Sequence, residues 1–257
     1  MSQLPVRWSD TFRAITNVLM DGSTIVSPDA GATGVSWSMA LAGLNEAELT
    51  TLENFFFTAQ GALNPFTMLD PADNLLAYSQ DFKQACWVND PLLTVTPGSG
   101  DPFGGTTAAV LTNSAEAAQS LTQQINGPGD YQYCFSVYLT SAKAETVVLS
   151  QTGAGAPLQA TAKTGTAWSR FVVTGATGTG DGVSFGVTLA PGAQVTIACA
   201  QVEPQPGAGP YKATTLCGGV YQDCRFDQDQ LNFTATGPNQ YGCALRIRSS
   251  VPTPWQP

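Results

Sequence analysis

The segment that decides the fold is Asn74-Leu75-Leu76-Ala77-Tyr78-Ser79-Gln80-Asp81-Phe82, where the composition of the chain changes. The stretch that follows has almost no charge runs and is rich in Gly, Thr, Ala and Ser. It closes at Gln201-Val202-Glu203-Pro204-Gln205-Pro206-Gly207-Ala208-Gly209-Pro210-Tyr211. The sequence therefore predicts a complete domain at 74–213, inserted into a discontinuous scaffold domain made of 1–73 and 217–257.

Alternation with a period of two predicts the structure of the insert. The clearest example is 131–139, where the alternation points Tyr133, Phe135, Val137 and Leu139 to one face. Gly, Pro and Asp turns separate this segment from further expected strands at 107–111, 146–149, 168–173, 183–189 and 194–199. Short strands at such spacing indicate a β-sandwich or jelly roll.

The scaffold is predicted to contain one helix among short strands. Asn45 and Glu48 have the spacing of a capping box, and Gly61 ends the helical pattern. Strands are expected at 24–26, 34–41, 64–71, 220–226, 231–236 and 241–248, with a turn at Asp21-Gly22. The chain is thus predicted to be mainly β, with a split scaffold, made of short strands and one flanking α-helix, that is interrupted by the β-sandwich.

Composition excludes several classes of function. The chain of 257 residues has a formal charge of −9 and only ten Lys and Arg, which argues against a nucleic-acid partner. It has no histidine, which removes Ser-His-Asp and Cys-His catalysis and most catalytic zinc sites. We therefore expect no enzyme, no cofactor and no metal site. The first residues show no secretory signal, and no apolar run is long enough for membrane insertion.

Six cysteines divide three and three between the two expected domains. Odd counts argue against a disulfide framework, and the absence of a CxxC pair argues against a metal knuckle. We expect small buried thiols.

The scaffold resembles the distal tail and minor tail proteins of long-tailed bacteriophages, including those of gene transfer agents. The resemblance rests on Arg225-Phe226-Asp227-Gln228-Asp229-Gln230-Leu231-Asn232-Phe233, on the helix end at 52–57 and on 66–71. It implies a small β-barrel that packs into a ring, expected to be a hexamer, between the tail tube protein and the tail hub. The chain departs from this family by carrying a whole domain after Asp70-Pro71.

The insert resembles the carbohydrate-binding jelly rolls of phage tail and tail-fibre proteins. The matching residues are the segment 74–82 with Trp87, the strand 133–139, the pair Trp168 and Arg170, and the closing segments at 200–204 and 210–211. The resemblance implies that the ends of the insert lie together and that its ligand is a glycan of the host surface.

Sugar binding uses aromatic rings against the apolar faces of pyranoses. The candidates in the insert are Tyr131, Phe103, Trp87 and Trp168, although Trp87 and Trp168 also fit core positions. Asp223, Asp227 and Asp229 could suggest a calcium site, but a solvated turn explains them better because the Gly and Glu of an EF-hand loop are missing. No pair of carboxylates stands out for glycosidase chemistry.

For ring packing, the candidates are the helix end and the last strand of the scaffold, namely Phe55, Phe56, Phe57, Tyr241, Leu245, Arg246 and Arg248. The function expected from the whole sequence is that of a structural virion protein. It would assemble in the host cytoplasm into a ring at the tail tip and present a glycan-binding domain. The alternatives are a free lectin-like protein and a tail-associated glycan hydrolase.

Overall fold

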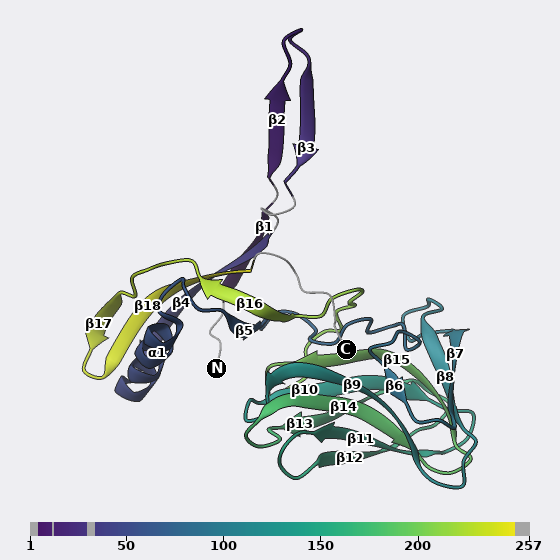
Figure 1. Cartoon of the computed structure of the whole chain (residues 1–257). Coiled ribbons are helices and arrows are strands. Elements are labelled where there is room, and N and C mark those ends of the chain that lie inside the picture. The colour runs from purple at the N-terminus through teal and green to yellow at the C-terminus, as the bar shows by residue number, and fades with distance from the viewer. Residues whose placement is uncertain (1–4, 12, 30–33, 250–257) are drawn as a thin grey trace. The chain divides into compact units, whose positions relative to one another are not determined.

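The computed structural model describes residues 5–11, 13–29 and 34–249, so the outer ends of the expected scaffold, 1–4 and 250–257, lie outside the described residues. The chain divides into two compact units (Figure 1). The scaffold unit contains the described residues up to Met68 and those from Tyr221 onward. The sandwich unit is Leu69–Val220. The chain thus leaves the scaffold unit once, builds the sandwich unit and returns.

The sandwich unit is formed by two five-stranded antiparallel sheets. The first sheet, which we call the front sheet, contains in spatial order β13 (Ser169–Gly175), β10 (Tyr133–Thr140), β15 (Gln194–Glu203), β8 (Ala108–Asn113) and β7 (Leu93–Ser99). The second contains β12 (Leu158–Lys163), β11 (Thr146–Thr152), β14 (Asp181–Leu189), β9 (Gln119–Pro128) and β6 (Val88–Asn89). Apolar side chains from both sheets share one core, which confirms the predicted β-sandwich.

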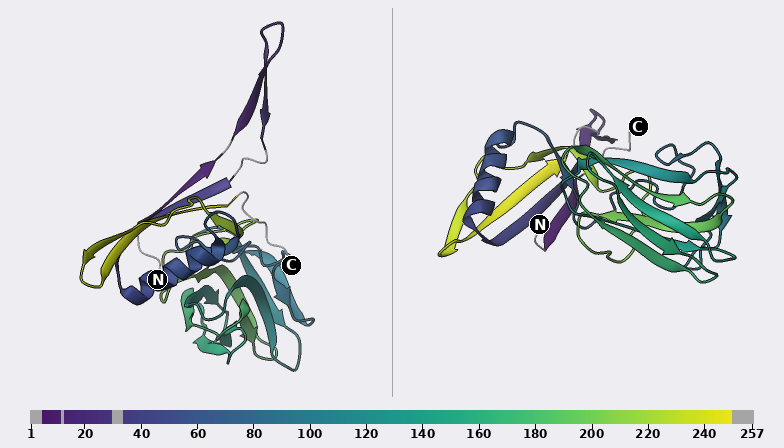
Figure 2. Two further views of the ribbon diagram at one scale, coloured as in Figure 1. Left: turned by 60° about the vertical axis from the view of Figure 1, so that its left-hand side comes forward. Right: turned by 90° about the horizontal axis from the view of Figure 1, so that it is seen from below.

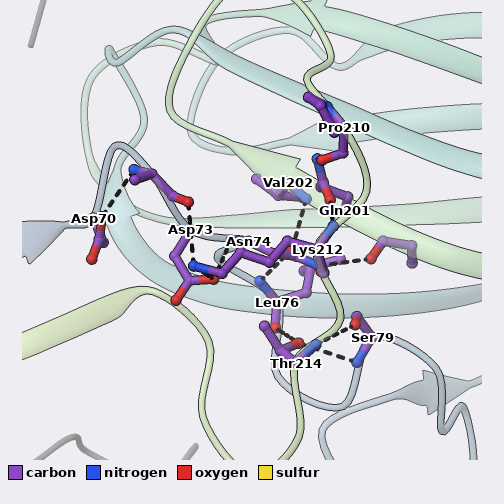
Figure 3. Close-up of polar contacts among 12 residues, drawn as sticks. Asp70, Asp73, Asn74, Leu76, Ser79, Gln201, Val202, Pro210, Lys212 and Thr214 are labelled. Atoms are coloured by element: carbon purple, nitrogen blue, oxygen red, sulfur yellow. Dashed lines mark hydrogen bonds and ion pairs between the residues drawn. The ribbon is translucent and has the colours of Figure 1, made fainter. Parts of the chain in front are cut away.

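A buried asparagine joins the two ends of the sandwich unit (Figure 3). The Asn74 side chain donates to the carbonyls of Ala200 (3.0 Å) and Lys212 (3.1 Å). Its Oδ1 accepts from the amides of Leu76 (3.1 Å) and Val202 (3.0 Å). Asn74 is fully buried, and its bonds to Ala200, Leu76 and Val202 are shielded from water. One side chain therefore ties the start of the unit to its last strand and to the segment that leaves it.

The scaffold unit has a six-stranded antiparallel sheet. Its strands in spatial order are β1 (Val6–Thr11), β4 (Gly34–Leu44), β18 (Gln240–Ser249), β16 (Val220–Phe226) and β5 (Phe66–Leu69), while β17 (Phe233–Gly237) pairs with the other end of β18. Within the described residues β1 and β5 are edges that do not pair with each other, so the sheet stays open. The expected closed barrel is corrected to an open sheet.

Helix α1 (Glu46–Ala59) lies on one face of this sheet (Figures 1 and 2). The predicted capping box is confirmed: the amide of Glu48 donates to the Asn45 side chain, and the Glu48 carboxylate accepts from the Asn45 amide. The helix ends at Gln60, which adopts the left-handed conformation. Its apolar stripe packs on the sheet around Phe226, which contacts the rings of Phe55, Phe56 and Phe66.

A two-stranded hairpin, β2 (Ala14–Val18) and β3 (Thr24–Pro28), completes the described structure. The predicted turn is present, because Gly22 has a positive φ of 82° and the Asp21 carboxylate accepts from the Ser23 amide. Nearly every hairpin residue is exposed, including Val18 and Met20.

None of the six cysteines forms a disulfide, and five of them are buried, which confirms the predicted buried thiols for all but the half-buried Cys217. Burial raises the pKa of Cys86, Cys134 and Cys199 from about 9 to about 11. The folded state therefore keeps these thiols neutral at a pH where the unfolded chain ionises them. We expect the contribution of these thiols to the stability to be constant below about pH 9 and to fall between pH 9 and 11.

Urea unfolding at a series of pH values checks this expectation. The variant Cys134→Ala should show a shallower fall than the parent, because one shifted thiol is removed. If the free energy of unfolding fell equally steeply with pH in the two proteins, the raised pKa of Cys134 would be contradicted.

Candidate glycan-binding site

The candidate site lies on the outer surface of the front sheet. Alternation along β10 sends Phe135, Val137 and Leu139 into the core and leaves Tyr138 on the opposite side. In the register of the sheet, Tyr138 faces Arg170 on β13 and Ala198 on β15. The neighbouring strands thus supply small and polar residues around one tyrosine ring.

Four aromatic side chains gather there, and we call Phe103, Tyr138, Trp168 and Tyr211 the aromatic face. Tyr138, Trp168 and Tyr211 are half-buried and pack on a floor of Ala108, Ala198 and Cys199. Phe103 lies edge-on to Tyr138, with ring centres 5.6 Å apart, and nearly parallel to Tyr211 at 6.2 Å. The Phe103 side chain is 64% exposed, so one of its surfaces is open to solvent.

The loop that carries Phe103 is held by one carboxylate. Asp101 accepts hydrogen bonds from the amides of Phe103 (2.9 Å), Gly105 (3.0 Å) and Thr107 (3.2 Å). Partial desolvation acts to raise the pKa of Asp101, but the bonds from Gly105, Thr107 and Phe103 outweigh it and hold the pKa below its ordinary value. The loop is therefore set in place before any ligand arrives.

Arg170 frames the other side of the aromatic face. Its guanidinium donates to the carbonyl of Gly209 (2.6 Å) and to the hydroxyl of Ser136 (2.8 Å), and it lies 5.6 Å from the centre of the Tyr138 ring. The carboxylate of Glu203 accepts from the amide of Gly209, which fixes the segment that Arg170 holds. This polar frame keeps Tyr138 in one orientation.

The Tyr211 ring is fixed from below. Its hydroxyl shares a hydrogen bond of 2.8 Å with the hydroxyl of Ser79. Burial raises the pKa of the Tyr211 hydroxyl.

The structure separates the four residues suggested by the sequence. Phe103 lies against Tyr138 and Tyr211, and Trp168 packs on the same floor as these two tyrosines. Trp87, by contrast, is 5% exposed and donates from its indole nitrogen to the carbonyl of Tyr78 (3.0 Å). Trp87 is thus a core residue, because its ring fills the apolar interior. Tyr131 is half-buried against Tyr133 and packs on the core. Neither belongs to the aromatic face.

Sequence reasoning did not select Tyr138, Tyr211 or Arg170 as site residues. A signal was present for Tyr138, since it takes the outward position in the clear alternation of β10. Tyr211 lies outside any strand, so only the folded chain shows that it meets Phe103.

The residues proposed for ring packing lie on different sides of the scaffold unit. Leu245 is 5% exposed and is a core residue of its own unit, and Phe56 packs on the same core. Phe57 is 74% exposed, and Arg246 and Arg248 are exposed on β18. Separately, Tyr241 donates from its hydroxyl to Glu46 on α1 (2.7 Å), and Phe55 is partly exposed beside Phe66.

Two further features bear on possible functions. Among the described residues, no group of three His, Cys, Asp or Glu side chains could hold a metal ion. No helix in that part of the chain is long and apolar enough to cross a membrane.

Comparisons with known proteins give structural matches only. No protein-family model matches the sequence, and no curated protein sequence matches it. The enzymatically active domain of tailspike protein 4 from bacteriophage CBA120 is similar, with 14% identity and a TM-score of 0.43 over 52% of this chain and 22% of that one. The chain therefore corresponds to less than a quarter of the tailspike chain.

Two carbohydrate-binding modules are matched over nearly their whole length. The xylan-binding domain CBM22-1 of Xyn10C from Paenibacillus barcinonensis has 13% identity and a TM-score of 0.45, over 55% of this chain and 100% of that one. TmCBM61, solved in complex with β-1,4-galactotriose, has 15% identity and a TM-score of 0.39, over 51% of this chain and 99% of that one. At these values the similarity does not extend to function.

Proposed function

We propose that the sandwich unit binds a glycan of a bacterial surface on its aromatic face. The observation that carries this proposal is the position of Phe103, an exposed ring that is held by a loop fixed by Asp101 and lies against the rings of Tyr138 and Tyr211. What distinguishes Phe103 from other exposed apolar side chains is that its loop is fixed and that its ring continues an aromatic surface, which a ligand could cover.

A sugar suits this surface for two reasons. The apolar C–H face of a pyranose packs on an aromatic ring, while its rim of hydroxyls needs polar partners nearby. On the sheet around Tyr138, the half-buried Arg170 offers such a partner, and the buried Ser136 hydroxyl and the Gly209 carbonyl hold its guanidinium in place. Because Asp101 already fixes the Phe103 loop, binding a sugar would cost little conformational entropy for ordering this loop.

We further propose that the chain is a structural, non-catalytic protein of a phage tail tip, located in the virion. In this role the scaffold unit forms a ring with copies of itself, a hexamer, between the tail tube protein and the tail hub, and needs no cofactor. The resemblance of 225–233 to tail-tip proteins supports this part of the proposal, as does the insertion of one unit within the other. Several copies in a ring would strengthen weak sugar binding by avidity.

Binding of the full chain to purified bacterial surface polysaccharides tests the glycan-binding proposal. We expect retention on at least one polysaccharide and no release of sugar. Phe103→Ala should weaken the binding about 30-fold, the effect of losing a hot-spot side chain worth about 2 kcal/mol.

The matched control is Val88→Ala, which shortens another exposed apolar side chain on the second sheet of the same unit. Its binding should equal that of the parent chain. Equal binding by the parent and Phe103→Ala would contradict the proposed site, and release of sugar would favour a tail-associated hydrolase. A chain that binds glycan but stays monomeric at every concentration would favour a free lectin.

A further inference from the structure

Four of the chain's six arginines lie on one surface of the scaffold sheet. In the sheet register, Arg7 on β1 and Arg246 on β18 flank Ser38 on the strand between them. Arg248 on β18 is paired with Arg225 on β16. Alternation places these side chains opposite the apolar residues that pack under α1. We call Arg7, Arg225, Arg246 and Arg248 the arginine face.

The positive charge of this surface is only partly compensated by the carboxylates of Asp227 and Asp229, which line its depressions. Arg248 forms a long ion pair of 3.6 Å with Asp227, and within the described residues Arg7, Arg225 and Arg246 have no carboxylate partner. Arg225 and Arg248 are directly opposite each other, an arrangement of like charges that destabilises a sheet. A chain with a formal charge of −9 and ten basic residues thus concentrates four of them where they repel each other.

The arginine face is also hollowed. A depression of about 310 Å³ is lined by Arg7, Ser38 and Arg246 together with Asp227 and neighbouring residues of β1 and β4. A second, of about 600 Å³, shares Ser38 and Arg246 and reaches Asp229. The surface can therefore receive protruding side chains from a partner.

The other side of the scaffold unit has the opposite charge. Helix α1 carries three glutamates and no basic residue. Glu46, Glu53 and Phe57 are spaced by seven and four residues, which places them on one stripe. A groove of about 320 Å³ between α1 and the segment 230–233 is lined by Glu53, Phe57 and Phe233, among others. We call it the α1 groove.

We propose that the arginine face of one copy docks on the α1 groove of the next copy. An arginine can form two hydrogen bonds with the Glu53 carboxylate and stack on the exposed Phe57 ring, which lysine does less well. One copy cannot satisfy itself, because α1 packs on the sheet surface opposite the arginines. The contact joins two different surfaces, so it propagates and closes into a ring if the rotation allows. This inference rests on the self-assembly included in the proposed function.

Charge reversal on each side of the contact tests the inference. Sedimentation velocity of the full chain at about 50 mM salt, where surface charges are weakly screened, should show self-association. Arg246→Glu and Glu53→Lys should each weaken it at least about tenfold. Lys163→Glu and Glu116→Lys make the same charge changes at exposed positions of the sandwich unit and should leave it unchanged.

Mixing the two variants gives the sharpest result. Each retains one intact surface, so a one-to-one mixture should associate through these two surfaces at least into dimers, which also shows that both variants are folded. No dimers in the mixture, or unchanged association of Arg246→Glu, would overturn this contact while leaving ring assembly in place. A parent chain that never self-associates would overturn both this contact and the proposed ring, whereas glycan binding would be unaffected.

Discussion

Replacing Asn74 by Ala should lower the free energy of unfolding of the sandwich unit by about 3–5 kcal/mol, one of the two largest effects we expect. The substitution leaves the amides of Leu76 and Val202 and the carbonyls of Ala200 and Lys212 without their partners in a buried region (Figure 3). Each unsatisfied buried group costs about 1–3 kcal/mol, and partial access of water reduces the sum.

Urea unfolding followed by circular dichroism measures this effect. Asn126→Ala is the matched control, since Asn126 is an exposed residue of β9 and should change the stability by less than about 0.5 kcal/mol. Asn74→Asp keeps the shape of the side chain but cannot donate to the two carbonyls, so it should be as damaging as Asn74→Ala. A loss below about 1 kcal/mol for both Asn74 variants would contradict the role given to this residue.

Phe226→Ala should destabilise the scaffold unit by about 3–5 kcal/mol, the range for removing a fully buried aromatic ring. Phe226 is 1% exposed, and its ring centre lies 5.0 to 5.5 Å from those of Phe55, Phe56 and Phe66. The substitution leaves a cavity between α1, β5 and β16, and the helix loses its main contact with the sheet.

Thermal unfolding by calorimetry checks this prediction, with Phe57→Ala as the control. Phe57 precedes the helix end on the same helix but is 74% exposed, so its loss should be small in the isolated chain. The transition of the sandwich unit should stay in place in both variants. Equal losses for Phe226→Ala and Phe57→Ala would show that the aromatic cluster is not the core of the scaffold unit.

Local signals account for the elements that the sequence predicts well. The capping box of α1 involves residues three apart, and β18 alternates from Gly242 to Ser249, so both can be recognised in a short window. Strand β9 lacks this clarity because Gln123 occupies an inward position, where it is buried and bonds the backbone of Ala77. Gln123 interrupts the apolar pattern of β9 in the sequence, and its buried partner Ala77 is too far away in the sequence to be foreseen.

The site was predictable only in part, for a related reason. Phe103 and Trp168 could be named from their types and contexts, but their convergence with Tyr211 depends on strand order in the front sheet. Whether the scaffold sheet is open or closed depends on which strands pair with each other, and a period-two pattern within one strand does not contain this information.

Amide hydrogen exchange of the full chain, with and without a polysaccharide that it retains, tests the central claim most directly. We predict that the polysaccharide slows exchange in the Phe103 loop, 101–107, and in the segment around Trp168 and Arg170. The peptides that contain Tyr131 and the strands of the second sheet should exchange at unchanged rates. Protection confined to the second sheet or to the scaffold unit, with the Phe103 loop unaffected, would contradict the assignment of the aromatic face as the glycan-binding site.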